Sequence, residues 1–123
     1  MDLPAFKATI AAAEPPAGLD LALQTLWWDA KGDWKKAHEC AQEEKTPIGS
    51  SVHAYLHRVE GDLANAGYWY NRAGKLPATG TIAAEWDVLA TELLGRWSAI
   101  RGREMTTRQN PDCQLGLGVA TVP

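Results

Sequence analysis

The chain has 123 residues and a formal net charge of -3 at pH 7. This length is enough for one domain to bury a hydrophobic core without support from a metal or a disulfide. The acidic balance and the lack of a basic stripe argue against a protein dedicated to nucleic-acid binding, because such binding depends on neutralising phosphates. No apolar run approaches the ~20 residues that a membrane-spanning helix requires, so the sequence predicts no membrane contact and a cytoplasmic location.

Six of the residues are tryptophan, a large number for a chain of this size. Each tryptophan has a large ring system to bury and an indole N–H that needs an acceptor. The sequence therefore predicts either a core lined by polar groups or a groove for a ligand. It predicts no cofactor.

Proline and glycine divide the chain into six segments with helical periodicity, and no segment alternates as a strand would. The expected helices occupy about residues 2–13, 19–31, 33–43, 50–60, 62–73 and 82–103. We expect residues 45–49, which include a proline, to form a loop, and Ser50 or Ser51 to cap the fourth helix. In the last helix, apolar residues recur every three or four positions between Ile82 and Ile100.

These segments predict an all-α fold, a six-helix bundle of antiparallel hairpins. We expect a single helical domain over residues 1–103. The composition of residues 104–123 has no helical period, so we expect an irregular tail that is partly disordered or strapped on the surface. The domain is expected to be a monomer or a weak homodimer.

A short pattern occurs twice, 29 positions apart: Gly32-Asp33 and Gly61-Asp62, each with an alanine four residues after the aspartate. Glycine suits the left-handed residue just beyond a helix, and aspartate suits the N-cap of the next helix. Each Gly-Asp pair therefore predicts the tight corner of an antiparallel helix pair.

The second of these units resembles a tetratricopeptide repeat. The residues that carry the resemblance are Gly61, Asp62, Ala66, Tyr70, Ala73 and Pro77. The first unit matches only at Gly32, Asp33 and Ala37, so the resemblance is to two degenerate repeats over about residues 19–77. It implies helix-turn-helix architecture and a protein-binding groove, toward which Asp29, Tyr55 and Arg58 would point.

Several short words of the sequence extend this comparison. Trp-Trp, Gly-Asp-Trp, His-xxx-His-Arg and Tyr-Trp-Tyr together resemble a small group of uncharacterised bacterial proteins. This second resemblance implies no known activity.

His53 and His57 are four residues apart, so on a helix they lie one turn apart on one face, and Glu60 continues the same stripe. Imidazoles and carboxylates in such a row are potential metal ligands or proton-transfer groups. His38 or Cys40 from the preceding helix could add a further ligand. The alternative is that both histidines are core groups that satisfy tryptophan N–H groups and carboxylates.

The Tyr68-Trp69-Tyr70 and Trp27-Trp28 words place aromatic rings on more than one side of their helices. With nearby polar groups these rings could form a small-molecule pocket, although packing between helices explains them as well. The candidate ligand-binding residues are Trp28, Asp29, His53, Tyr55, His57, Arg58, Asn65, Tyr68 and Arg72. The candidate metal ligands are His38, His53, His57 and Glu60.

Two functions follow from these patterns. The first is a non-catalytic helical interaction or ligand-binding module for an unknown protein or small molecule. The alternative is a metal- or small-molecule-binding protein, or an enzyme, that uses His53, His57 and Glu60. The sequence has no glycine-rich phosphate loop and no nucleophile elbow, so we predict no catalytic residue.

Overall fold

The computed structural model describes residues 1–103, which form six helices and no strand. The helices are α1 (Leu3–Thr9), α2 (Leu21–Ala30), α3 (Trp34–Glu43), α4 (Pro47–Val59), α5 (Leu63–Ala73) and α6 (Ile82–Arg103). The prediction of an all-α fold with six helices is confirmed. The predicted tail, 104–123, lies outside the described residues.

The two Gly-Asp corners have the backbone geometry that the sequence predicts. Gly32 and Gly61 have φ angles of 86° and 87°, in the left-handed region that favours glycine. The Asp33 carboxylate accepts a hydrogen bond from the backbone N–H of Lys36, and Asp62 caps its helix in the same way. These corners fold α2 against α3 and α4 against α5 as two hairpins.

The helix α4 begins earlier than the sequence predicts. It starts at Pro47, and the Thr46 hydroxyl, rather than Ser50 or Ser51, accepts the capping hydrogen bond from Gly49 N–H. The prediction of a loop over residues 45–49 is therefore wrong in its second half. Proline stops a helix from within but is favoured in its first turn, where its missing N–H costs nothing.

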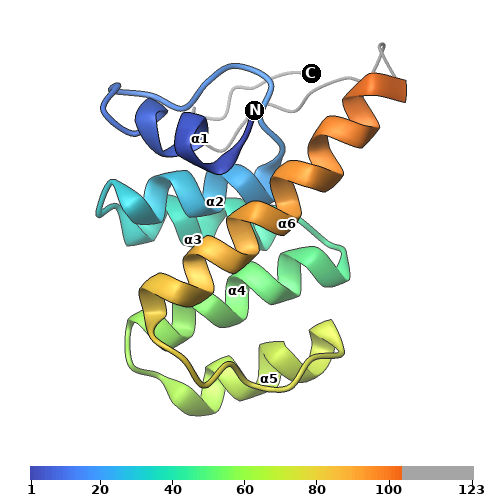
Figure 1. Cartoon of the computed structure of the whole chain (residues 1–123). Helices are drawn as coiled ribbons and strands as arrows, with labels where there is room; N and C mark the ends of the chain where they lie inside the picture. Colours follow the sequence, from blue (N-terminus) through green and yellow to red (C-terminus); the bar gives the residue numbers. More distant parts are fainter. Residues whose placement is uncertain (104–123) are drawn as a thin grey trace.

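The helix α6 lies across the first helices of both hairpins (Figure 1). It contacts α2 and α4, and the indole N–H of Trp86 donates to the Leu26 carbonyl at 3.0 Å. α6 also contacts α1, where the rings of Phe6 and Trp86 stack with their centroids 5.8 Å apart. The faces of α2 and α4 that contact α6 are thus covered by the chain itself.

The tryptophans join the helices into one core. Four indole N–H groups donate across the fold, to Thr9 Oγ1 and to the carbonyls of Leu56, Leu26 and Gly18. The donors are Trp27, Trp34, Trp86 and Trp97. Trp28 Nε1 is buried and has no acceptor within the described part of the chain. Core packing with satisfied N–H groups therefore accounts for most of the tryptophan content.

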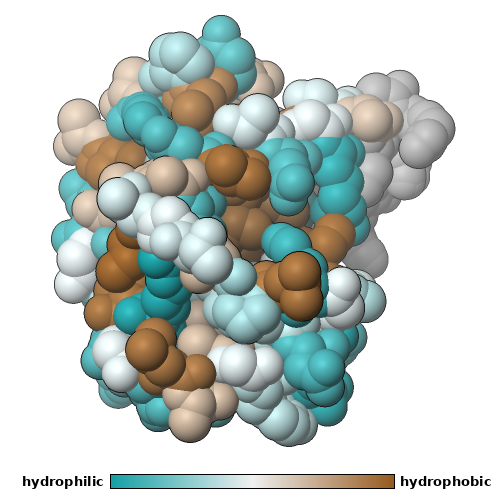
Figure 2. Space-filling model, turned by 60° about the horizontal axis from the view of Figure 1, so that its bottom comes forward, coloured by the Kyte–Doolittle hydropathy of each residue, from teal (hydrophilic) through white to brown (hydrophobic). Residues whose placement is uncertain are grey.

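The surface carries isolated apolar side chains such as Leu63, Leu76 and Val88. Figure 2 shows one face on which the hydrophobic residues form small groups separated by hydrophilic ones. Scattered apolar residues of this kind are normal for a folded domain. Within residues 1–103, no helix is both long and apolar enough to cross a bilayer.

Candidate functional site

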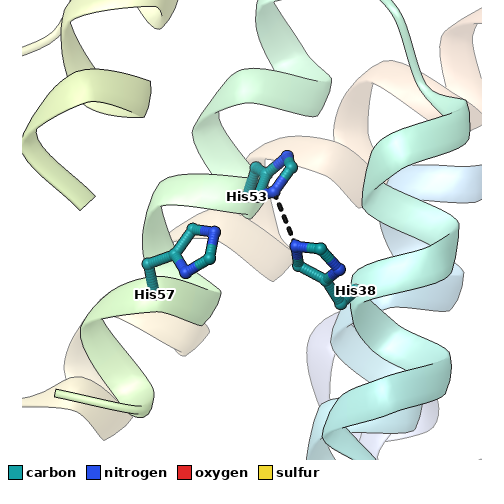
Figure 3. A group of neighbouring side chains, drawn as sticks. All are labelled: His38, His53 and His57. Atoms are coloured by element: carbon teal, nitrogen blue, oxygen red, sulfur yellow. Dashed lines mark hydrogen bonds between the residues drawn. The ribbon is translucent and has the colours of Figure 1, made fainter. Parts of the chain in front are cut away.

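All three histidines of the chain converge between α3 and α4. His38 lies on α3, whereas His53 and His57 lie one turn apart on α4, and Figure 3 shows the three rings turned toward a common space. Each contributes one ring nitrogen, and these nitrogens lie within 4.8 Å of one another. The His38 and His53 Nε2 atoms are 2.9 Å apart, so one ring donates a hydrogen bond and the other accepts it.

Two tryptophans fix the orientation of the histidine rings. Trp34 lies one helical turn before His38 and stacks on it, with the centroids 4.7 Å apart and the planes at 14°. Trp69, on α5, stacks on His53 at 3.9 Å and 11°. The Trp34 indole is itself anchored, since its N–H donates to Leu56 O at 2.9 Å. The rings are therefore held by packing rather than by solvent contacts.

The third imidazole is oriented by a carboxylate. His57 Nδ1 lies 2.7 Å from Glu60 Oε2, a hydrogen bond between residues three positions apart on α4 and its C-cap. When Nδ1–H donates to the carboxylate, the neutral ring keeps the lone pair on Nε2. Metal-binding histidines commonly have this arrangement, in which a carboxylate fixes the tautomer and makes the ring a better ligand.

Burial favours the neutral form of His38 and His53. His53 is only 4 % exposed, and its burial, together with the neighbouring His38 and His57, lowers its pKa to about 4. Burial and the nearby His57 also lower the pKa of His38, although Glu60 and Glu39 oppose this shift. At neutral pH both rings are uncharged, with lone pairs available for coordination.

The cluster is buried on the helix side and reaches solvent at its rim. His53 and His57 are almost fully buried, His38 is half-buried, and Glu60 is exposed. His57 and Glu60 also belong to a second group of potential ligands, with Asp62 as the third member. The geometry thus offers an all-nitrogen set inside the fold and a carboxylate-rich set at its surface.

The other candidate ligand-binding residues divide over several places. Tyr55 and Arg58 lie on the other side of α4, where Tyr55 OH donates to Asp29 of α2 at 2.7 Å and Arg58 pairs with Glu85 of α6 at 2.9 Å. Tyr55 lies two residues from both His53 and His57, so Tyr55 and the two histidines occupy opposite sides of α4. The predicted set therefore includes members of two separate sites.

The remaining candidates lie in neither group. Asn65 donates its backbone N–H to the Asp62 cap, and Trp28 packs edge-on against Trp27 in the core. On α5, the Arg72 guanidinium lies over the rings of Tyr68 and Trp69. Because Trp69 stacks on His53, Arg72 and Tyr68 lie at the outer edge of the histidine cluster without belonging to it.

The sequence alone did not indicate the stacking partners Trp34 and Trp69. The spacing of Trp34 and His38 by four residues was an available signal, because such residues share one helix face. For Trp69 no local signal exists, since its contact with His53 depends on how α5 packs on α4. Cys40, the other possible ligand from α3, lies in the hydrophobic core and belongs to neither group of potential ligands.

Comparisons with protein-family models, curated proteins and solved structures find no match to this chain.

Proposed function

We propose that the protein binds a divalent late first-row transition-metal ion, with Zn²⁺ as the main candidate, through His38, His53 and His57. The observation that carries the proposal is the convergence of three imidazole nitrogens from two helices within 4.8 Å of one another. Imidazole is a preferred ligand for Zn²⁺, Cu²⁺ and Ni²⁺.

The protonation state of the cluster supports metal binding. The pKa of His53, about 4, means that a metal ion does not compete with a proton at neutral pH. On coordination, whichever of His38 and His53 donates the hydrogen bond between them moves its proton to Nδ1. A tetrahedral ion with three protein nitrogens keeps one position for water, and Glu60 supplies the outer carboxylate that orients His57.

Metal binding is favoured over a protein-docking role by the position of α6. The two hairpins and their repeated Gly-Asp corners support a relation to degenerate tetratricopeptide repeats, whose first helices line the binding groove. Here those helices are α2 and α4, and α6 packs on both (Figure 1). A peptide that bound in this groove would have to displace Trp86 from its hydrogen bond to Leu26. The histidine cluster lies away from this contact.

The test is calorimetric titration of the full chain with Zn²⁺, accompanied by thermal unfolding. Binding at one equivalent is expected, with a stabilisation of about 2.7 kcal/mol when free Zn²⁺ is a hundred times its dissociation constant. Substitution of Co²⁺ provides a visible spectrum that reports a four-coordinate site with three nitrogen ligands. Absence of binding at neutral pH would refute the proposal.

Two variants distinguish the two groups of potential ligands. His38→Gln removes a member of the three-histidine set alone, and Asp62→Asn removes one of the two carboxylates of the surface set while keeping a good helix cap. We expect His38→Gln to abolish binding and Asp62→Asn to leave it unchanged. The reverse result would show that the ion binds to the surface set, His57, Glu60 and Asp62, instead. Glu60→Gln should weaken binding about 10- to 100-fold, as loss of an outer-shell partner does.

A further inference from the structure

A second candidate site lies on the opposite side of α4. A cavity of about 520 Å³ opens where α1 and the end of α2 meet α4 and the first half of α6. Its walls include Ile10, Ala30, Ile82, Ala83 and Trp86, and its polar groups come from Lys7, Asp29, Tyr55 and Asp87. This volume is typical of small-molecule sites, which combine apolar walls with a few polar groups. It is the part of the groove between α2 and α4 that α6 leaves open.

The charge of the cavity is dominated by one carboxylate. Asp29 accepts a hydrogen bond from the Tyr55 hydroxyl at 2.7 Å, and among residues 1–99 it takes part in no ion pair. Lys7 and Asp87 pair with each other at 3.0 Å and are about half exposed, so their charges largely cancel at the rim. One negative charge therefore remains inside without a cation.

The main side-chain donors of the cavity already have partners. Tyr55 OH donates to Asp29, the Trp86 indole N–H donates to Leu26 O, and the Lys7 ammonium pairs with Asp87. An anionic ligand would face the Asp29 carboxylate inside the cavity, and the one cation of the lining, Lys7, is paired with Asp87 at the exposed rim. A cationic ligand would bring its own donors to the Asp29 carboxylate, which has capacity for further hydrogen bonds.

We propose that this cavity binds a small organic ammonium ion with an aromatic or branched apolar body, the ammonium group pairing with Asp29 and the body packing against Ile10, Ile82 and Trp86. The pair would be a charge-assisted hydrogen bond in a half-buried site, where it is stronger than in water. Burial raises the pKa of Asp29, which fits a carboxyl group that lacks a cationic partner.

The experiment measures binding of three probes with the same body by calorimetry and by the NMR shift of the Trp86 indole N–H. The probes are 2-phenylethylamine, 2-phenylethanol and 3-phenylpropionate, at a pH where the amine is charged. We expect the amine to bind at least about tenfold more tightly than the alcohol, because an ionic hydrogen bond replaces a neutral one. The carboxylate should not bind. Equal affinity for the amine and the alcohol would overturn the proposal.

Variants locate the ammonium group and the body. Asp29→Asn keeps an acceptor for Tyr55 OH but removes the charge, and it should weaken amine binding at least about tenfold. Asp62→Asn, which removes a carboxylate outside the cavity and keeps a good helix cap, is the matched control and should leave the affinity unchanged. Ala83→Leu should block the cavity without changing its charge. If Asp29→Asn binds the amine as tightly as the unmodified chain, Asp29 is not the anchor and the proposal is wrong.

Binding at this cavity is independent of the metal proposal. His38→Gln, which tests the metal site, should leave the affinity for 2-phenylethylamine unchanged because the two groups lie on opposite sides of α4. Loss of amine binding in that variant would contradict the separation of the two sites.

Discussion

Acid should destabilise the fold through His53, and the size of the effect follows from its environment. In the unfolded chain this imidazole titrates near 6.5, whereas burial and the two neighbouring histidines lower the pKa in the folded chain to about 4. Between these values the unfolded state binds the proton and the folded state does not. Stability is therefore complete above pH ~6.5 and falls as the pH decreases toward ~4. Over this range the unfolding free energy decreases by about 3 kcal/mol at most, with a maximum slope of about 1.4 kcal/mol per pH unit.

The assay is urea unfolding of the full chain and of His53→Gln, without added metal, at several pH values between 4 and 7. Other groups titrate in this range, and burial raises the pKa of Asp20 and Asp29, which makes their contributions opposite in sign. These contributions are shared by both proteins, so the difference between the two pH profiles isolates His53. We expect the unmodified chain to lose more stability than the variant as the pH falls.

An NMR titration of the His53 ring provides the direct check. A pKa near 6.5 for this residue in the folded chain, or parallel pH profiles for the two proteins, would refute the reasoning. Zn²⁺ gives an independent test of the same cluster, because protons compete with a bound metal ion and its binding should therefore make the acid-induced loss of stability steeper.

Three further predictions concern the corners and the buried polar contacts. Gly61→Ala should lower the unfolding free energy by about 1 kcal/mol because φ is 87°, whereas Gly67→Ala, inside α5 with open space around it, should raise it by about 0.5–1 kcal/mol. Asp62→Ala should cost about 1 kcal/mol by removing the cap of α5. Tyr70→Phe should cost about 1–3 kcal/mol, because Tyr70 OH donates to Glu85 at 2.6 Å and that half-buried carboxylate then loses a donor. Thermal and urea unfolding measure all four variants, and an unchanged Gly61→Ala protein would contradict the corner geometry.

The sequence by itself determined the features that depend on neighbours along the chain. Apolar spacing located the helices, and the Gly-Asp pairs predicted two corners whose φ angles and caps the structure bears out. The alignment of His57 with Glu60 was also predictable, because residues three apart on a helix are adjacent. The local rule failed at Pro47, since proline both ends helices and begins them and only the cap at Thr46 decides between the two.

Only the tertiary structure decided how these local features combine. His38 meets His53 because α3 packs on α4, and Trp69 stacks on His53 because α5 folds back on the same helix. The Asp29 cavity and the histidine cluster lie on opposite sides of α4, and α6 covers only the side with the cavity, although the sequence placed Asp29 and His53 in one candidate set. Helical periodicity specifies which face of each helix is buried. It does not specify which helix covers that face. The packing is set by large side chains, such as Trp34 and Trp86, that interlock between segments far apart in the chain.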